Sequence, residues 1–227
     1  RRGSVAALAL IGLAGLSSAH AAPTGGTIAA GNGIGDIHNT LDRKQVSINQ
    51  HTQKLIIDWN SFNIGADERV AFNQPGASSI ALNRVNGLSP SSILGRMDAN
   101  GQVFLVNPNG IVFGKGAEVN VGGLVASTKL LSDADFNAGN YRFAGTSEAA
   151  VLNQGVIAAR DRGSVALLGA KVSNQGVIQA RLGRIALAAG GAFTVNFDGN
   201  GLLDLRMDGA ALSALAENGG MLSADGG

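Results

Sequence analysis

The chain reads VLNQGVI at residues 151–157 and VSNQGVI at residues 172–178, so one pattern of apolar residues around Asn-Gln-Gly returns after about 20 residues. A second pattern, GSVAL at 163–167, returns as GRIAL at 183–187. A third copy of the first pattern begins at Asn218, which we interpret as two coils beyond Asn174. Self-similarity at this period marks a solenoid, in which no single repeat buries its own apolar face.

The repeated units are four to six residues long, rich in β-branched residues and bounded by Gly or Asn, which is typical of strands. A leucine-rich repeat has a similar period, but its fixed Leu and Asn spacing is absent. The sequence therefore predicts an all-β fold, a parallel β-helix of about ten coils, because stacked coils repeat every ~4.8 Å and each uses about 20 residues. Residues 22–60 are less repetitive and are expected to form an N-terminal cap.

Equivalent asparagines of successive coils are expected to stack. Asn153 and Asn174 fit corners, since Asn tolerates left-handed backbone and forms local hydrogen bonds. A structural role is favoured over ligand binding at both positions. Residues 218–227 begin another coil, so the natural protein is expected to continue past them.

The N-terminal segment has the features of a cleavable secretory signal. Arg1 and Arg2 are basic, residues 5–16 are apolar, and Ala19-His20-Ala21 has the form of a cleavage site. The apolar run is too short for a membrane anchor. We expect a signal peptide at 1–21, lacking part of its basic region, and a mature domain at 22–227.

Composition excludes several classes of function. The whole chain has 17 basic and 16 acidic residues and no cysteine, so neither a nucleic-acid partner nor a disulfide framework is expected. His38 and His51 lack metal-ligand spacing, and Asp133 with Asp135 is expected in a solvated loop. No metal, cofactor or catalytic residue is predicted, although parallel β-helices also include carbohydrate-active enzymes.

The densest local signal is Gly101–Val106, a predicted strand, followed by Asn107-Pro108-Asn109-Gly110 and then Ile111. Asn, Pro and Gly at the first, second and fourth positions favour a type I turn. Turn chemistry alone leaves open whether this is a hairpin or a sharp corner of the solenoid.

The chain also resembles the N-terminal two-partner secretion (TPS) domain of filamentous haemagglutinin-like exoproteins, over about residues 25–225. The resemblance is carried by IDWNSFNIG (57–65), VAFNQP (70–75), ALNRV (81–85), ILG (93–95), ANGQVFLVNPNGI (99–111) and VNVGGLVAST (119–128). The block at 107–111 is the most specific of these segments.

The resemblance implies a right-handed β-helix that is exported by the Sec machinery and recognised in the periplasm by a TpsB-type outer-membrane β-barrel transporter with POTRA domains. It implies a secreted or cell-surface protein whose missing downstream region acts on a host or neighbouring cell as adhesin, haemolysin or contact-dependent toxin. An autotransporter passenger is the remaining alternative besides an enzyme.

Candidate site residues follow from this resemblance. Asn107, Pro108, Asn109, Gly110 and Ile111 form the candidate secretion motif, with Asn107 and Asn109 acting either in recognition or only in the turn. Asn83 and Arg84 are further candidates, more simply explained as a solvated or ladder pair. Trp59 and Phe62 are expected in core or cap packing rather than in a sugar-binding platform.

Overall fold

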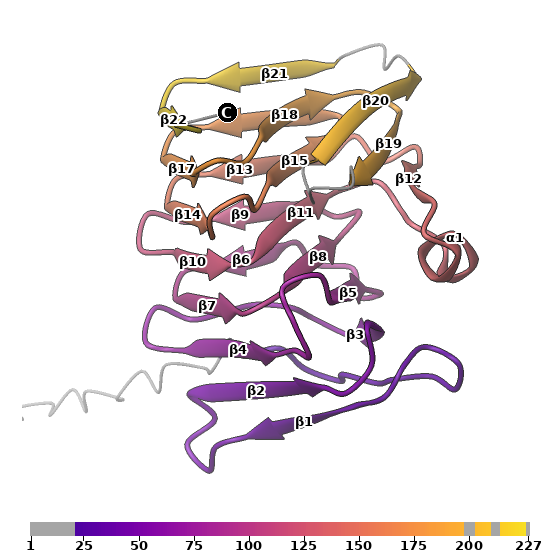
Figure 1. Cartoon of the computed structure of the whole chain (residues 1–227). Coiled ribbons are helices and arrows are strands. Elements are labelled where there is room, and N and C mark those ends of the chain that lie inside the picture. The colour runs from indigo at the N-terminus through magenta and orange to yellow at the C-terminus, as the bar shows by residue number, and fades with distance from the viewer. Residues whose placement is uncertain (1–20, 198–202, 210–213, 226–227) are drawn as a thin grey trace, which may run out of the picture.

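The computed structural model describes residues 21–197, 203–209 and 214–225. Strands stack along one axis into a rod, with a helix and a small sheet on one side (Figure 1). The expected signal peptide at 1–21 lies outside the described residues except for Ala21. Within the described ranges, no helix is long and apolar enough to cross a membrane.

Sheet 1 is the longest face of the rod. It has the strand order β1-β2-β4-β7-β10-β14-β17-β22. The strands are β1 (Gly35–Asn39), β2 (Gln45–Gln50), β4 (Arg69–Asn73), β7 (Arg96–Ala99), β10 (Glu118–Val121), β14 (Val156–Ala159), β17 (Val177–Ala180) and β22 (Met221–Ser223). Only β1 is antiparallel to its neighbour, so it closes the end of an otherwise parallel ladder.

Sheets 2 and 3 form the other two faces. Sheet 2 contains β3 (Lys54–Trp59), β5 (Ile80–Val85), β8 (Gln102–Val106), β11 (Gly123–Ser127), β15 (Val165–Gly169) and β18 (Ile185–Ala189). Sheet 3 contains β6 (Ser91–Ile93), β9 (Ile111–Phe113), β13 (Ala150–Asn153), β16 (Lys171–Asn174) and β21 (Leu215–Asn218). All pairings within these two sheets are parallel, and the prediction of a parallel β-helix is confirmed.

Two excursions leave the helix between sheets 2 and 3. The first forms α1 (Asp133–Ala138) and β12 (Tyr141–Ala144), and the second forms β19 (Ala192–Phe197) and β20 (Leu203–Gly209). Strands β12, β19 and β20 pair antiparallel as a separate outer sheet. Because these residues do not coil, the expectation of about ten coils was wrong: the described part of sheet 1 has seven parallel strands.

Two other expectations about the coils need correction. Asn218 pairs directly with Asn174, so these residues lie in adjacent coils, and the 44-residue spacing contains the β19–β20 excursion. The cap is also shorter than residues 22–60, because β2 and β3 already pair in parallel with the next coil. The cap consists of β1 and the segment whose residues Thr24 and Thr27 bridge to Ser61 and Asp58.

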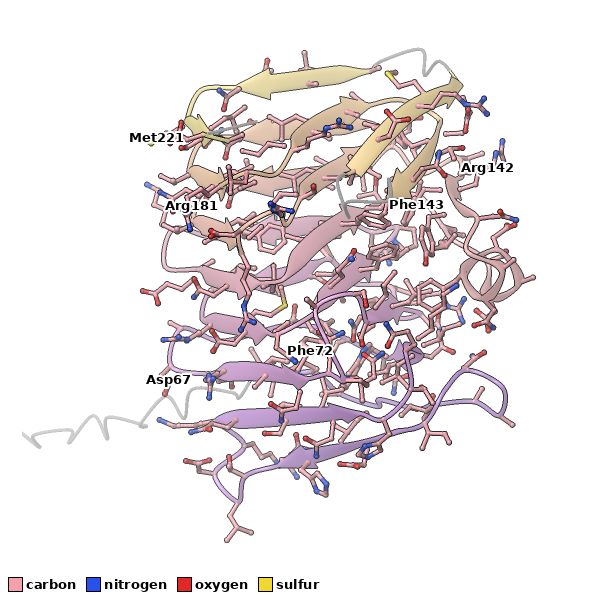
Figure 2. The ribbon with its side chains drawn as sticks, in the orientation of Figure 1. Asp67, Phe72, Arg142, Phe143, Arg181 and Met221 are labelled. Atoms are coloured by element: carbon pink, nitrogen blue, oxygen red, sulfur yellow. The ribbon has the colours of Figure 1, made fainter. Side chains whose placement is uncertain are left out.

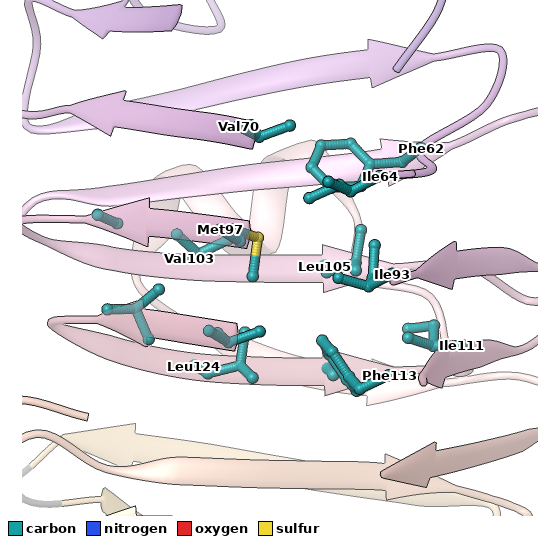
Figure 3. Packing of buried hydrophobic residues seen from close by; sticks show 14 of the residues in the cluster. Phe62, Ile64, Val70, Ile93, Met97, Val103, Leu105, Ile111, Phe113 and Leu124 are labelled. Atoms are coloured by element: carbon teal, nitrogen blue, oxygen red, sulfur yellow. The ribbon is translucent and has the colours of Figure 1, made fainter. Parts of the chain in front are cut away.

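The main core fills the interior between the three sheets. Strands contribute alternate side chains to it, as the pleat requires, and Figure 3 shows layers from successive coils in contact along the axis. Phe113, Met97 and Leu105 are each fully buried there. Burying a side chain of this size stabilises the fold by roughly 1.5–3 kcal/mol.

A second core lies outside sheet 2. There Phe104, Leu82 and Val125 point away from the main core and pack against α1, β12 and β19. Figure 2 shows Phe143 turned toward the sheets, whereas Arg142 beside it points outward. Burial on both faces explains why β8, β11 and β15 are almost continuously apolar.

Close stacking of corners leads to a prediction about glycine. A Cβ at Gly183 would overlap the carbonyl oxygen of Gly163 in the preceding coil, whereas a Cβ at Gly76 meets nothing within 4 Å. We expect Gly183→Ala to lower the free energy of unfolding by about 1–3 kcal/mol, because the coils must separate, and Gly76→Ala to leave it nearly unchanged. Urea unfolding of the two variants measures this, and equal midpoints would contradict the stacking.

Candidate functional site

The candidate secretion motif forms the corner between β8 and β9. The Gly110 amide donates to the Asn107 carbonyl at 3.1 Å, which closes the turn, and Gly110 has φ = 119°, a conformation that favours glycine. Strand β8 pairs within sheet 2 and β9 within sheet 3. The turn is therefore a corner of the solenoid and not a hairpin.

Asn107 is fully buried and uses both ends of its amide. Its Nδ2 donates to the Ser89 carbonyl and to Ser91 Oγ, each at 3.0 Å. Its Oδ1 accepts from the Asn109 amide at 2.9 Å. The side chain thus joins the corner to the preceding coil.

Asn109 and Pro108 are held from opposite sides. Asn109 Nδ2 donates to the Gly87 carbonyl at 2.8 Å, in the coil below. The Pro108 carbonyl accepts from Ser147 Oγ at 2.6 Å, in the loop above. Gly110 and Ile111 are buried, so the folded corner presents little of the motif to a partner.

Lys129 positions the loop that covers this corner. It is 1 % exposed, and its Nζ donates to the carbonyls of Gly145 and Ser147 at 3.0 and 2.6 Å. Thr128 Oγ1 donates to the Ala149 carbonyl at 3.2 Å. Sequence reasoning missed Lys129 and Ser147, since their role depends on the first excursion. A lysine three residues after the apolar run 123–126 was the only signal of it.

Asn83 and Arg84 do not form the solvated or ladder pair that was expected. They are neighbours on a strand and therefore point to opposite faces of sheet 2. Asn83 is fully buried in the main core, where its Oδ1 accepts from Trp59 Nε1 at 3.0 Å. Trp59 and Phe62 are 2 % and 1 % exposed and pack edge to face, which leaves neither ring as a sugar platform.

Arg84 lies on the outer face of sheet 2, at the centre of a polar network. It binds Asp58 through Nε and Nη2 at 2.7 and 3.1 Å, and Asp133 through Nη1 at 2.5 Å. The hydrogen bonds with Asp58 hold the pKa of Arg84 above its ordinary value despite partial burial. Burial alone would raise the pKa of Asp133, but hydrogen bonds from Arg84 and Asn32 outweigh it and leave that pKa below its ordinary value.

The asparagines of successive coils form a ladder at the ends of sheet 3 strands, buried at Asn153 and Asn174 and exposed at Asn218. Asn153 Nδ2 donates to Asn174 Oδ1 at 2.8 Å, and Asn174 Nδ2 donates to Asn218 Oδ1 at 2.7 Å. The expected stacking is present, but the backbone there is not left-handed. The non-glycine residues with positive φ are instead Arg43, Arg162 and Leu182, among the residues that the structure describes.

The acidic pair and the two histidines singled out in the sequence lie at α1 and around Asp36. Asp133 lies in the first turn of α1 and not in the predicted solvated loop, and Ser132 caps that helix by accepting from the Asp135 amide. His38 and His51 both lie beside Asp36, on the exposed cap. Within the described ranges, no group of three such residues could hold a metal ion.

Comparison with known proteins decides the family. The model of the TPS secretion domain matches residues 19–226. The chain belongs to the TPS secretion domain family. It is a secretion domain of the kind that filamentous haemagglutinin-like exoproteins carry, as the resemblance predicted.

Relatives and solved structures agree with this membership. The chain is 36% identical over 218 residues to a heme/hemopexin-binding protein of Haemophilus influenzae, covering 92% of this chain and 23% of the relative. The HMW1 secretion domain of Haemophilus influenzae superposes with a TM-score of 0.80 at 33% identity, covering 90% of this chain and 54% of that chain. The filamentous hemagglutinin secretion domain shares the fold, with a TM-score of 0.50 at 15% identity over 92% of this chain and 80% of that chain. This TPS domain spans about a quarter of the length of the first curated relative.

The asparagine ladder of the TPS domain yields a testable difference in stability. Asn174→Ala removes both inter-coil amide bonds and leaves the buried amide of Asn153 and the exposed amide of Asn218 without this partner. We expect it to lower the free energy of unfolding by about 1–3 kcal/mol, because one buried amide loses its partner. Gln175→Ala breaks only the exposed Gln154–Gln175 bond and is expected to cost less than about 0.5 kcal/mol. Chemical denaturation of both variants tests this, and similar costs would mean that the ladder is not a specific source of stability.

Proposed function

We propose that a cognate TpsB-type outer-membrane β-barrel transporter recognises this domain in the periplasm before the domain folds. The signal at 1–21 directs the chain through the Sec machinery, and the mature domain begins near Ala22. POTRA domains of the transporter then bind extended segments of the chain. The segment 107–111 is the candidate for specific recognition.

Burial of the Asn107–Ile111 corner is the observation that supports recognition before folding. In the folded domain Asn107 is fully buried, and loops of the coils below and above hold the corner. In the unfolded chain the amides of Asn107 and Asn109 are free to bind a partner. A short extended segment can add to a sheet edge, where main-chain hydrogen bonds give affinity and alternate side chains give selectivity.

Folding at the cell surface follows from the same burial. Once the corner closes, the amide groups that the transporter reads become occupied within the domain. Release from the transporter and formation of the coil are thereby coupled, and each coil offers a parallel edge to the residues that follow. The folded domain then carries the downstream protein outward.

The activity of the whole protein lies in that downstream region. Relatives named for heme/hemopexin binding, and the HMW1 and filamentous hemagglutinin secretion domains, suggest cargo that binds a host component, as an adhesin does. The domain itself is proposed to have no catalytic role, and the downstream region is proposed to meet a host or neighbouring-cell surface.

Export assays of two matched variants separate recognition from folding. Asn107→Asp alters the candidate motif, whereas Ser147→Ala loosens the same corner through Pro108 without changing a motif residue. We expect Asn107→Asp to reduce secretion at least tenfold and Ser147→Ala to reduce it less than twofold, when each is co-expressed with the transporter and measured in the medium.

Urea unfolding of the purified variants provides the control, because it measures the stability that each variant has lost. If the two variants lose equal stability and equal secretion, Asn107 acts only through the turn. Equal secretion of the unaltered domain with and without the transporter would refute the proposed partner altogether.

A further inference from the structure

Helix α1 contacts Lys54 of β3, which precedes its binding partners by 82 and 83 residues. Lys54 Nζ on β3 donates to the carbonyls of Phe136 and Asn137 at 2.9 and 3.0 Å, at the end of the helix. The same ammonium lies 5.7 and 5.5 Å from the ring centres of Phe136 and Tyr141. The Phe136 carbonyl also accepts from the Gly139 amide at 3.1 Å, so Lys54 adds a charged donor to the carbonyls at the end of α1 and stabilises the helix there.

The other end of α1 is tied to the cap. Asp133 accepts from Asn32 Nδ2 at 2.9 Å as well as from Arg84, and Asn32 is 7 % exposed. The Asn32 carbonyl in turn accepts from the Ile56 amide at 2.8 Å. One carboxylate therefore joins the cap, the second coil and the excursion.

Apolar contacts also connect the early coils to the two excursions. Phe104, in the third coil, lies 6.1, 5.2 and 6.2 Å from the ring centres of Phe136, Tyr141 and Phe197. Strand β12 pairs with β19, in register Tyr141 with Val195. Without the excursions, the outer face of sheet 2 would expose the apolar side chains of the second core to water.

In a simple solenoid each repeat contacts only its neighbours, so stability builds up coil by coil. The contacts of α1 break this rule, because they link residue 32 to residue 133 and residue 54 to residue 136. We infer that residues 132–143, which we call the clasp, lock the N-terminal cap and the first coils, and that these reach their final stability only when the clasp docks.

In a chain that emerges from its N-terminus, the cap and the first three coils are available before the clasp. The cap and the first three coils do not form an independent stable seed, because their lock is supplied by residues that emerge later. The domain then folds as one cooperative unit at about the length where the clasp becomes available. This extends beyond the proposed recognition and does not require it.

Hydrogen exchange of the complete folded chain, without any transporter, tests the clasp. In Asp133→Ala, we expect the amides of Ile56 and Asp58, which donate to Asn32 and Thr27, to exchange at least tenfold faster than in the unaltered protein. Amides of Val156 and Val177, which bind the coil below them in the later part of the rod, are expected to change less than twofold.

Two further variants make the result decisive. Asp161→Ala removes the exposed Arg181–Asp161 pair between adjacent corners and is expected to leave exchange of the Ile56 and Asp58 amides unchanged. Lys54→Met keeps the aliphatic part of the side chain but removes the hydrogen bonds to the two helix carbonyls. It replaces Asp133→Ala if that variant does not fold, and the same amides are expected to exchange faster. Faster exchange confined to residues 132–144, or an equal increase at all amides, would overturn the inference.

Discussion

Parallel backbone ladders require each coil to lie directly on the coil below. This constraint determines which residues fit at the inward positions and at the corners of the domain. Side chains at equivalent positions of successive coils lie one strand spacing apart. Inward positions are occupied by apolar residues, or by a polar residue that binds the equivalent residue of the next coil, as in the Asn153–Asn174–Asn218 ladder. A corner accepts glycine where the next coil approaches its backbone, as at Gly163 and Gly183.

The excursions change this regular solenoid into a domain with long-range order. They cover the outer face of sheet 2 and bring Asn32, Arg84 and Asp133 together from three separate parts of the chain. The same first excursion supplies the loop whose Ser147 binds the Pro108 carbonyl. One insertion thus holds both the cap and the corner that carries the candidate secretion motif, and it links the folding of the domain to the burial of that motif.

Much of the fold could be predicted from the sequence because the repeat is local. The strands at 151–157 and 172–178 and the turn at 107–110 follow from composition and turn chemistry within a few residues. The position of residues 128–149 in the fold could not be predicted. Apolar strands such as 103–106 and 124–126 have the same sequence pattern whether one face of the sheet or both faces are buried. That ambiguity also concealed the clasp and led to the overestimate of the coil number.

Polar residues were harder to place than apolar ones. Asn83 gave no sign of lying in the main core, because its partner, Trp59 Nε1, belongs to the preceding coil. Asp133 was expected in solvent, since the pairing with Arg84 spans 49 residues. The wide spacing of Asn218 from Asn174 likewise hid an adjacency that is plain once the β19–β20 excursion is recognised.

The central claim is that the transporter reads the motif before the domain folds. The most direct measurement is binding of the purified transporter to the domain either freshly diluted from urea or fully refolded, with Asn107→Asp treated identically. We predict that the unfolded domain binds at least tenfold more tightly than the refolded domain, and that Asn107→Asp loses this binding only in the unfolded sample. Equal binding of the folded and unfolded domain would contradict the account.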